Sequence, residues 1–146
     1  MRTPRPRLTW RLGAVISGVA TAAALAIGVP ATASAAEHDG GCDSYEICLF
    51  YNSNYGGAKR DFARNVPNFA SYRYFSPGNG AGQIVKNNAA AAYNYDHGST
   101  ARIYYNSNYA GPADDIRPRS GRQQLGDTYN DNASMRWCFG QSWTCG

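Results

Sequence analysis

The chain has 146 residues, with 14 Lys and Arg against 10 Asp and Glu, a formal net charge of +4. Four basic residues precede residue 12 and no acidic residue precedes Glu37, so removing residues 1–36 would leave ten of each sign. A neutral remainder excludes the electrostatic footprint of a protein that binds nucleic acid or anionic membranes. The remaining 110 residues suffice for one domain, and abundant Gly, Tyr and Asn favour an all-β, turn-rich fold.

The first 36 residues have the three parts of a secretory signal peptide. Arginines lie within residues 2–11, residues 12–29 are almost all apolar or small, and residues 33–35 form a small-x-small cleavage site. A membrane anchor is the alternative, but an Ala- and Gly-rich segment followed directly by a cleavage site argues against it. We expect a signal peptide over 1–36 and a secreted, extracellular domain over 37–146, with no membrane attachment after cleavage.

The four cysteines form two close pairs: Cys42 with Cys48, and Cys138 with Cys145. In an oxidising compartment they predict two disulfides, for which three pairings exist. The pairing within each close pair is favoured, because each bond would then close a short loop. Zinc is the rival interpretation, but the spacing, the export signal and the presence of only His38 and His97 argue against it.

An aromatic and Asn-rich segment occurs twice. Residues 50–57 (FYNSNYGG) recur as residues 104–111 (YYNSNYAG), 54 positions later, and each copy follows a short run typical of a β-strand. Asn and Gly tolerate left-handed backbone angles, so each copy predicts a folded hairpin whose two aromatic rings pack over the turn. The residues that define this hairpin motif are Phe50, Tyr55, Gly57, Tyr104, Tyr109 and Gly111.

A second element, rich in Asn and Asp, follows each hairpin at residues 87–92 and 130–135. The first half has extra length over 67–82, which predicts a longer loop or hairpin in which residues 72–75 could form a strand. The four alanines at 89–92 are too few for a stable helix, so we interpret them as small residues entering a buried strand.

Two similar units in one small domain predict a pair of Greek-key motifs that form an all-β sandwich with a pseudo-twofold axis. Motif one is expected over about residues 47–95 and motif two over about 101–138, followed by a C-terminal disulfide loop at 138–145. Neither unit can bury both faces of its strands alone, whereas pairing the units covers one face of each.

The hairpin pattern and the Asn/Asp element resemble those of the βγ-crystallin superfamily. Within it, the chain is most similar to small secreted bacterial peptidase inhibitors of the metalloproteinase-inhibitor type, which begin with Cys-x5-Cys ahead of the first hairpin, as residues 42–48 do here. The similarity covers residues 42–137. It implies a βγ-crystallin-like Greek-key sandwich, inhibition of thermolysin-type metalloproteinases, and a monomer whose partner is an extracellular peptidase.

In that superfamily the Asn/Asp element holds calcium, and this chain departs from the pattern. Ala91, Ala92 and Met135 stand where the element carries hydroxyl residues. Calcium needs six to eight oxygen ligands, so the lost hydroxyls thin its shell. Weak calcium candidates remain at Asn130, Asp131 and Ser134. We expect no metal and no cofactor, with the Asn and Asp residues turning the chain instead.

The inhibitors of this type present their reactive bond on a disulfide-tied loop in the second half, but the positions do not correspond here. The loop between Cys138 and Cys145 still has suitable ingredients, namely a tether, a glycine and two large aromatics. Phe139, Gln141 and Trp143 are therefore the candidate protease-contact residues. The alternative is a C-terminal hairpin whose aromatics cover the end of the barrel.

Three arginines in six residues, Arg117, Arg119 and Arg122, make a second candidate contact loop for an acidic partner or a trypsin-like pocket. The alternative is a solvated basic loop whose charge is balanced by Asp114 and Asp115.

Enzymatic activity finds no support in the sequence. GxSxG, HExxH and Walker-type phosphate motifs are absent. The main prediction is thus a secreted, non-enzymatic inhibitor of extracellular peptidases that blocks the active-site cleft with a rigid loop. Two alternatives stay open: an antimicrobial or killer-toxin-like βγ-crystallin protein, and a structural calcium-associated extracellular module.

Overall fold

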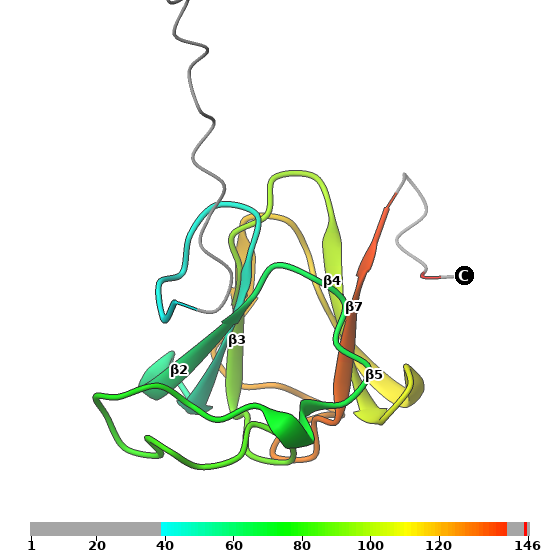
Figure 1. Cartoon of the computed structure of the whole chain (residues 1–146). Helices are drawn as coiled ribbons and strands as arrows, with labels where there is room; N and C mark the ends of the chain where they lie inside the picture. The colour runs from blue at the N-terminus through cyan, green and yellow to red at the C-terminus, as the bar shows by residue number, and fades with distance from the viewer. Residues whose placement is uncertain (1–38, 140–144, 146) are drawn as a thin grey trace, which may run out of the picture. The chain divides into compact units, whose positions relative to one another are not determined.

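The computed structural model describes residues 39–139 and Cys145, so the expected signal peptide at 1–36 lies outside the described residues. Within the described part, seven strands and one short 3-10 helix, η1, follow one another along the chain (Figure 1). No helix in this part is long and apolar enough to cross a membrane. The elements are β1 (Ile47–Asn52), β2 (Gly56–Phe62), η1 (Phe69–Ser71), β3 (Ala91–Asn94), β4 (Thr100–Asn106), β5 (Ala110–Ile116), β6 (Ser120–Arg122) and β7 (Ser134–Cys138).

The strands form two antiparallel sheets, and each sheet pairs with a segment from the other half of the chain. The first sheet has the order β2-β1-β3-β6 and the second β5-β4-β7. Although β6 comes from the second half of the chain, it pairs with β3 of the first half. Val66 of the first half pairs in return with Met135 in β7. The predicted Greek-key β-sandwich is confirmed, and the exchange makes each sheet depend on both halves.

The predicted hairpins are present in both sheets, and the repeated residues explain them. Asn54, Tyr55 and Gly57 have positive φ values, and the Phe50 and Tyr55 rings meet edge to face at 5.6 Å. Gly57 has a further steric reason, because a Cβ there would lie 2.8 Å from the carbonyl oxygen of Asn79.

The second hairpin repeats this geometry. Asn108, Tyr109 and Gly111 also have positive φ, and the Tyr104 and Tyr109 rings lie 6.0 Å apart. Since two copies of one sequence pattern adopt one backbone shape, the turn is encoded locally.

The core lies between the two sheets and draws on alternate strand positions. On β1, Ile47 and Leu49 point into the main core, whereas Cys48 and Phe50 belong to a second apolar cluster. Each fully buried large side chain contributes about 1.5–3 kcal/mol through loss of water-exposed apolar area. Large side chains that fill the main core are Phe62, Phe69, Val85, Ile103, Ile116 and Met135.

The long loop of the first half differs from the expectation in one respect. Residues 72–75 do not form a strand, and only Arg73 makes an isolated bridge, to Ile84. Backbone hydrogen bonds from Tyr74 N–H to Gln83 O (3.0 Å) and from Val85 N–H to Tyr72 O (2.9 Å) tie this segment to residues 83–85. Tyr74 is also buried, and its hydroxyl donates to the carbonyl of Asn88. The alanines at 89–92 are all buried and lead into β3, as predicted.

Asn132 joins the two halves from a fully buried position. Its Oδ1 accepts from the backbone N–H groups of Asn88 and Ala89 at 3.1 and 2.8 Å, and its Nδ2 donates to the carbonyl of Val85 at 2.9 Å. One side chain of the second half therefore bonds three backbone groups of the first, among them the buried N–H of Ala89.

Candidate functional site

One end of the sandwich collects the candidate residues, and the strand registers place them there. Ile47 at the start of β1 pairs with Asn94 at the end of β3, and Asn94 also pairs with Ser120 at the start of β6. Thr100 at the start of β4 pairs with Cys138 at the end of β7. The segments that meet at this end, called the loop end below, are residues 39–46, 95–99, 117–119 and 138–139.

The predicted disulfide pairing is present. Cys42 is bonded to Cys48 and Cys138 to Cys145. Cys138 is buried at the end of β7, whereas the next residue, Phe139, is 76% exposed. The ring of Phe139 therefore lies at the surface. Gln141 and Trp143 lie outside the described residues.

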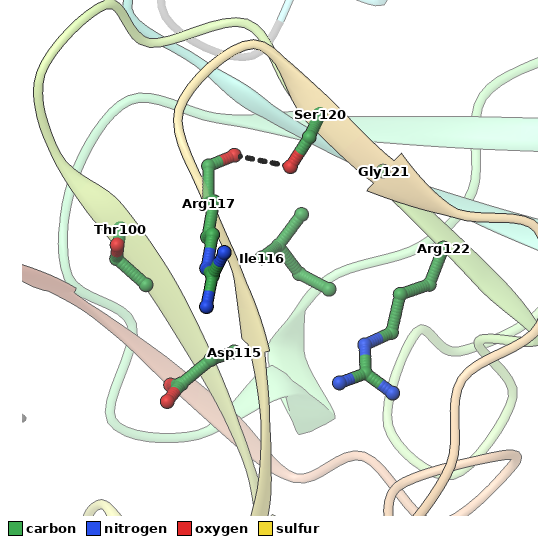
Figure 2. A pocket seen from close by; sticks show the side chains of 7 residues that line it. All are labelled: Thr100, Asp115, Ile116, Arg117, Ser120, Gly121 and Arg122. Carbon is green, nitrogen blue, oxygen red and sulfur yellow. Dashed lines mark hydrogen bonds between the residues drawn. The ribbon is translucent and has the colours of Figure 1, made fainter. Parts of the chain in front are cut away.

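The turn between β5 and β6, residues 117–119 and called the arginine turn below, borders a hollow of about 420 Å³ (Figure 2). The side chain of Arg117 is directed toward Asp115, and Arg122 lies on the other side of Ile116. Ser120 Oγ donates to the carbonyl of Arg117 at 2.9 Å and closes the turn.

The two neighbouring aspartates have separate ion-pair partners. Arg122 Nη1 lies 3.2 Å from Asp114 Oδ1, and Arg102 pairs with Asp115 through two 2.6 Å hydrogen bonds. The bond to Asp115 raises the pKa of Arg102, so this arginine stays charged at every physiological pH. The expected balance of the loop by Asp114 and Asp115 therefore involves Arg122 directly and Arg102 from outside the loop.

Arg119 does not share this hollow. Its Nη2 donates to the imidazole of His97, 3.0 Å from Nδ1, and it borders a second hollow of about 270 Å³ together with Ser44, Tyr93 and Tyr95. The three arginines that the sequence grouped as one contact loop thus face two different places.

The structure also places one residue at the loop end that sequence reasoning missed. Tyr45, inside the first disulfide loop, is 61% exposed and stacks on His97 with ring centroids 5.0 Å apart. The available signal was a large aromatic between two closely paired cysteines, which predicts a tethered and exposed ring.

Glu46 stabilises the backbone of the same disulfide loop. Its side chain is fully buried, and Oε2 accepts from the backbone N–H of Asp43 at 2.8 Å. Burial, with the nearby Asp61 charge adding to it, raises the pKa of Glu46 above its usual range. Because the carboxyl holds loop backbone and does not face a hollow, we assign it a structural role.

The calcium candidates do not come together as a calcium site. Ser134 Oγ donates to the carbonyl of Asn106 at 2.7 Å and accepts from Tyr109 N–H at 3.0 Å, so it is fully engaged. Lys86 Nζ donates to Ser107 Oγ at 3.1 Å in the hollow that Asp131 also lines. The lysine ammonium in this hollow repels a second cation and the Ser134 hydroxyl is already used, so the donor set does not fit calcium. Within residues 39–139 no group of three His, Cys, Asp or Glu is arranged to hold a metal.

The two exchanged sheets and repeated aromatic hairpins define a βγ-crystallin-type domain. A structure from work on the evolution of the eye-lens βγ-crystallin fold superposes with a TM-score of 0.56 at 15% identity, covering 70% of this chain and 93% of that chain. The N-terminal domain of protein S gives 0.50 at 22% identity, covering 64% and 96% respectively. At such identities the likeness establishes the fold.

The family follows from the sequence match. Residues 35–116 match the model of peptidase inhibitor family I36, and the chain belongs to that family. No curated protein matches the sequence. Family and fold identify a non-enzymatic protein with a peptidase as partner, and the two disulfides are compatible with secretion.

Proposed function

We propose that the protein is a secreted, monomeric inhibitor of extracellular metalloproteinases, which blocks the active-site cleft with the disulfide-tied loop after β7. The observation that carries the proposal is the position of Phe139. This large apolar side chain is 76% exposed, directly beside a cysteine that is buried in the sheet and bonded to Cys145.

The physical argument is that both ends of the loop are tied before it binds. Cys138 pairs with Thr100 in the second sheet, and the bond to Cys145 ties the other side of the loop to it. A loop fixed in advance loses less conformational freedom on association, so more of the contact energy appears as affinity. Thermolysin-type enzymes favour bulky apolar side chains beside the scissile bond, and Phe139 offers one.

The test begins with an inhibition panel across secreted metallo-, serine and cysteine peptidases. We expect a stable one-to-one complex with a thermolysin-type enzyme, and weakening by about 30-fold in Phe139→Ala, the size of an interface hot spot. Replacing Cys138 and Cys145 together by Ser should also weaken inhibition, because the loop would have to be ordered on binding.

The matched control is Tyr129→Ala, which removes another exposed aromatic, 38% accessible, away from the loop. Its inhibition should equal that of the unmodified protein. Unchanged inhibition in both loop variants would exclude the loop as the contact, and inhibition restricted to serine or cysteine peptidases would reject the metalloproteinase target.

A further inference from the structure

A second group of side chains lies at the loop end and is called the Tyr45 cluster. Tyr45, His97 and Arg119 are exposed, and Tyr93 and Tyr95 are half-buried beside them. Tyr45 stacks on His97, whose imidazole accepts from Arg119, and the Tyr93 and Tyr95 rings lie 4.5 Å apart. These side chains come from the first disulfide loop, from β3 and the turn after it, and from the arginine turn. Three separate segments therefore converge on one surface.

Two residues of this cluster have strained backbones. Tyr45 has φ +74° and Arg119 has φ +51°, in the left-handed region that bulky L-residues avoid. Such strain persists only where surrounding contacts enforce it. Here Arg119 N–H donates to Asp96 O at 3.1 Å, and Tyr93 Oη donates to Arg119 O at 3.2 Å.

The strain does not serve the core. Tyr45 is 61% exposed and Arg119 is also exposed, so the enforced angles hold side chains at the surface instead of burying them. Asn or Gly at either position would relieve the backbone without opening a cavity. Strain that only presents two exposed side chains is typical of a contact surface.

The chemistry of the cluster indicates what it contacts. Tyr and Arg are the residues most enriched at binding hot spots, and tyrosine supplies contact area with little loss of conformational freedom. The residues described as lining the 270 Å³ hollow are Ser44, Tyr93, Tyr95, His97 and Arg119, which include no carboxylate. The Arg119 guanidinium can therefore donate hydrogen bonds to a carboxylate of a partner protein, next to the apolar edges of the tyrosine rings.

We propose that the Tyr45 cluster is a second contact surface for the peptidase, in which Arg119 binds an acidic side chain on the enzyme beside its cleft and Tyr45 packs on the adjoining apolar surface. The register supports a shared partner, because Tyr45, His97, Arg119 and Phe139 all lie at the loop end. This inference rests on the proposed inhibitory function and assigns it a contact that is independent of the C-terminal loop.

The test uses substitutions that suit the left-handed backbone. Tyr45→Asn and Arg119→Asn remove the side chains while keeping an allowed conformation, so the melting temperature should stay the same or rise slightly. Inhibition of thermolysin should nevertheless weaken about 30-fold for Tyr45→Asn and about tenfold for Arg119→Asn. Added salt should weaken the unmodified complex more than the Arg119→Asn complex, because only the former contains the ion pair.

Two controls separate the possible results. Arg117→Ala removes a cation from the same turn outside the cluster, and Tyr129→Ala removes an exposed tyrosine elsewhere; neither should reproduce the losses. Unchanged inhibition in Tyr45→Asn and Arg119→Asn, while Phe139→Ala still weakens it, would overturn this inference and leave the proposed function standing. If the unmodified protein inhibits no peptidase, both proposals fail together.

Discussion

The outer faces of the two sheets carry different chemistry on the same backbone. On the first sheet Cys48 pairs with Tyr93, and this face continues as an aromatic and disulfide surface with Phe50, Tyr55 and Tyr95. On the second sheet Arg102, 54 positions after Cys48, pairs with Arg136 and forms the ion pair with Asp115. The two sheets share the residues of the hairpin turns but differ at the positions that point away from the core. We infer that the turn residues specify the fold, whereas the outward positions can vary with function.

The aspartates Asp61 and Asp115 show the same divergence within one residue type. They too are 54 positions apart and occupy equivalent places beside β1 and β4. Asp61 is fully buried under the first disulfide segment and accepts from Gly40 N–H, whereas the Asp115 side chain is 34% exposed and binds Arg102. Residues 39–46 cover Asp61, whose carboxylate binds the backbone of this segment, whereas no such segment covers Asp115.

The largest loss of stability is expected when the hydrogen bonds that Asn132 makes between the two halves are removed. Asn132→Ala leaves the buried N–H of Ala89 without a partner and removes the hydrogen bonds to Asn88 N–H and Val85 O, which still bond each other at 3.2 Å. The corresponding residue of the first half is itself alanine, Ala89. One orphaned buried N–H costs about 1–3 kcal/mol and each of the two further lost hydrogen bonds about 0.5–1.5 kcal/mol, so the free energy of unfolding should fall by about 3 kcal/mol or more. Denaturant unfolding measures the loss.

The control for this substitution is Asn130→Gly, since Asn130 is exposed and has φ +55°. It should be nearly neutral. A loss in Asn132→Ala no larger than in Asn130→Gly would mean that the halves do not depend on this side chain.

The next effect compares the two hairpin glycines. Gly57→Ala and Gly111→Ala both place a Cβ at positive φ, but the Cβ at Gly57 meets the backbone oxygen of Asn79, whereas that at Gly111 meets the end of the Asn106 side chain, which can move. We expect losses of about 2–3 kcal/mol and about 1 kcal/mol respectively. Equal losses in thermal unfolding would show that the two turns have the same tolerance.

A smaller effect tests the buried carboxyl beneath the first disulfide loop. The raised pKa of Glu46 means that the folded state binds its proton more tightly than the unfolded state does. Its contribution to stability is therefore present below the unfolded pKa and is lost as the pH rises through the folded pKa. Glu46→Gln should raise the melting temperature by a few degrees at pH 7, and the difference should vanish toward pH 4. A gain that persists at pH 4 contradicts this assignment.

The smallest effect is expected on the charged face. Asp115→Asn breaks a partly exposed ion pair, which water and salt screen, so the loss should stay below about 1 kcal/mol and shrink further in 1 M NaCl. A loss comparable to that of Asn132→Ala would show that the second sheet's face is as structural as the interface between the halves.

The repeat made the fold predictable, because the aromatic, Asn and Gly positions act over a few residues and recur. The exchange of β6 and Val66 between the sheets was not predictable from the repeat, because it depends on pairing between residues far apart in the chain. The hydrogen bonds of Asn132 were not predictable for the same reason, because they join residues more than 40 positions apart.

The site was predictable only in part. The sequence singles out Phe139 as a candidate because a cysteine pair marks its loop, but the Tyr45 cluster combines three segments that carry no common motif. Arg117, Arg119 and Arg122 do not border one hollow, since Arg119, at positive φ, contacts His97 while the other two border the 420 Å³ hollow.

The most direct measurement of the account is a hydrogen-exchange footprint of the peptidase complex, comparing the two ends of the sandwich. We predict slowed exchange at the loop end, over residues 43–46, 95–97 and 138–139, with little change at the hairpin turns at 52–56 and 106–110. Protection confined to those turns, with the loop end exchanging as in the free protein, would contradict it.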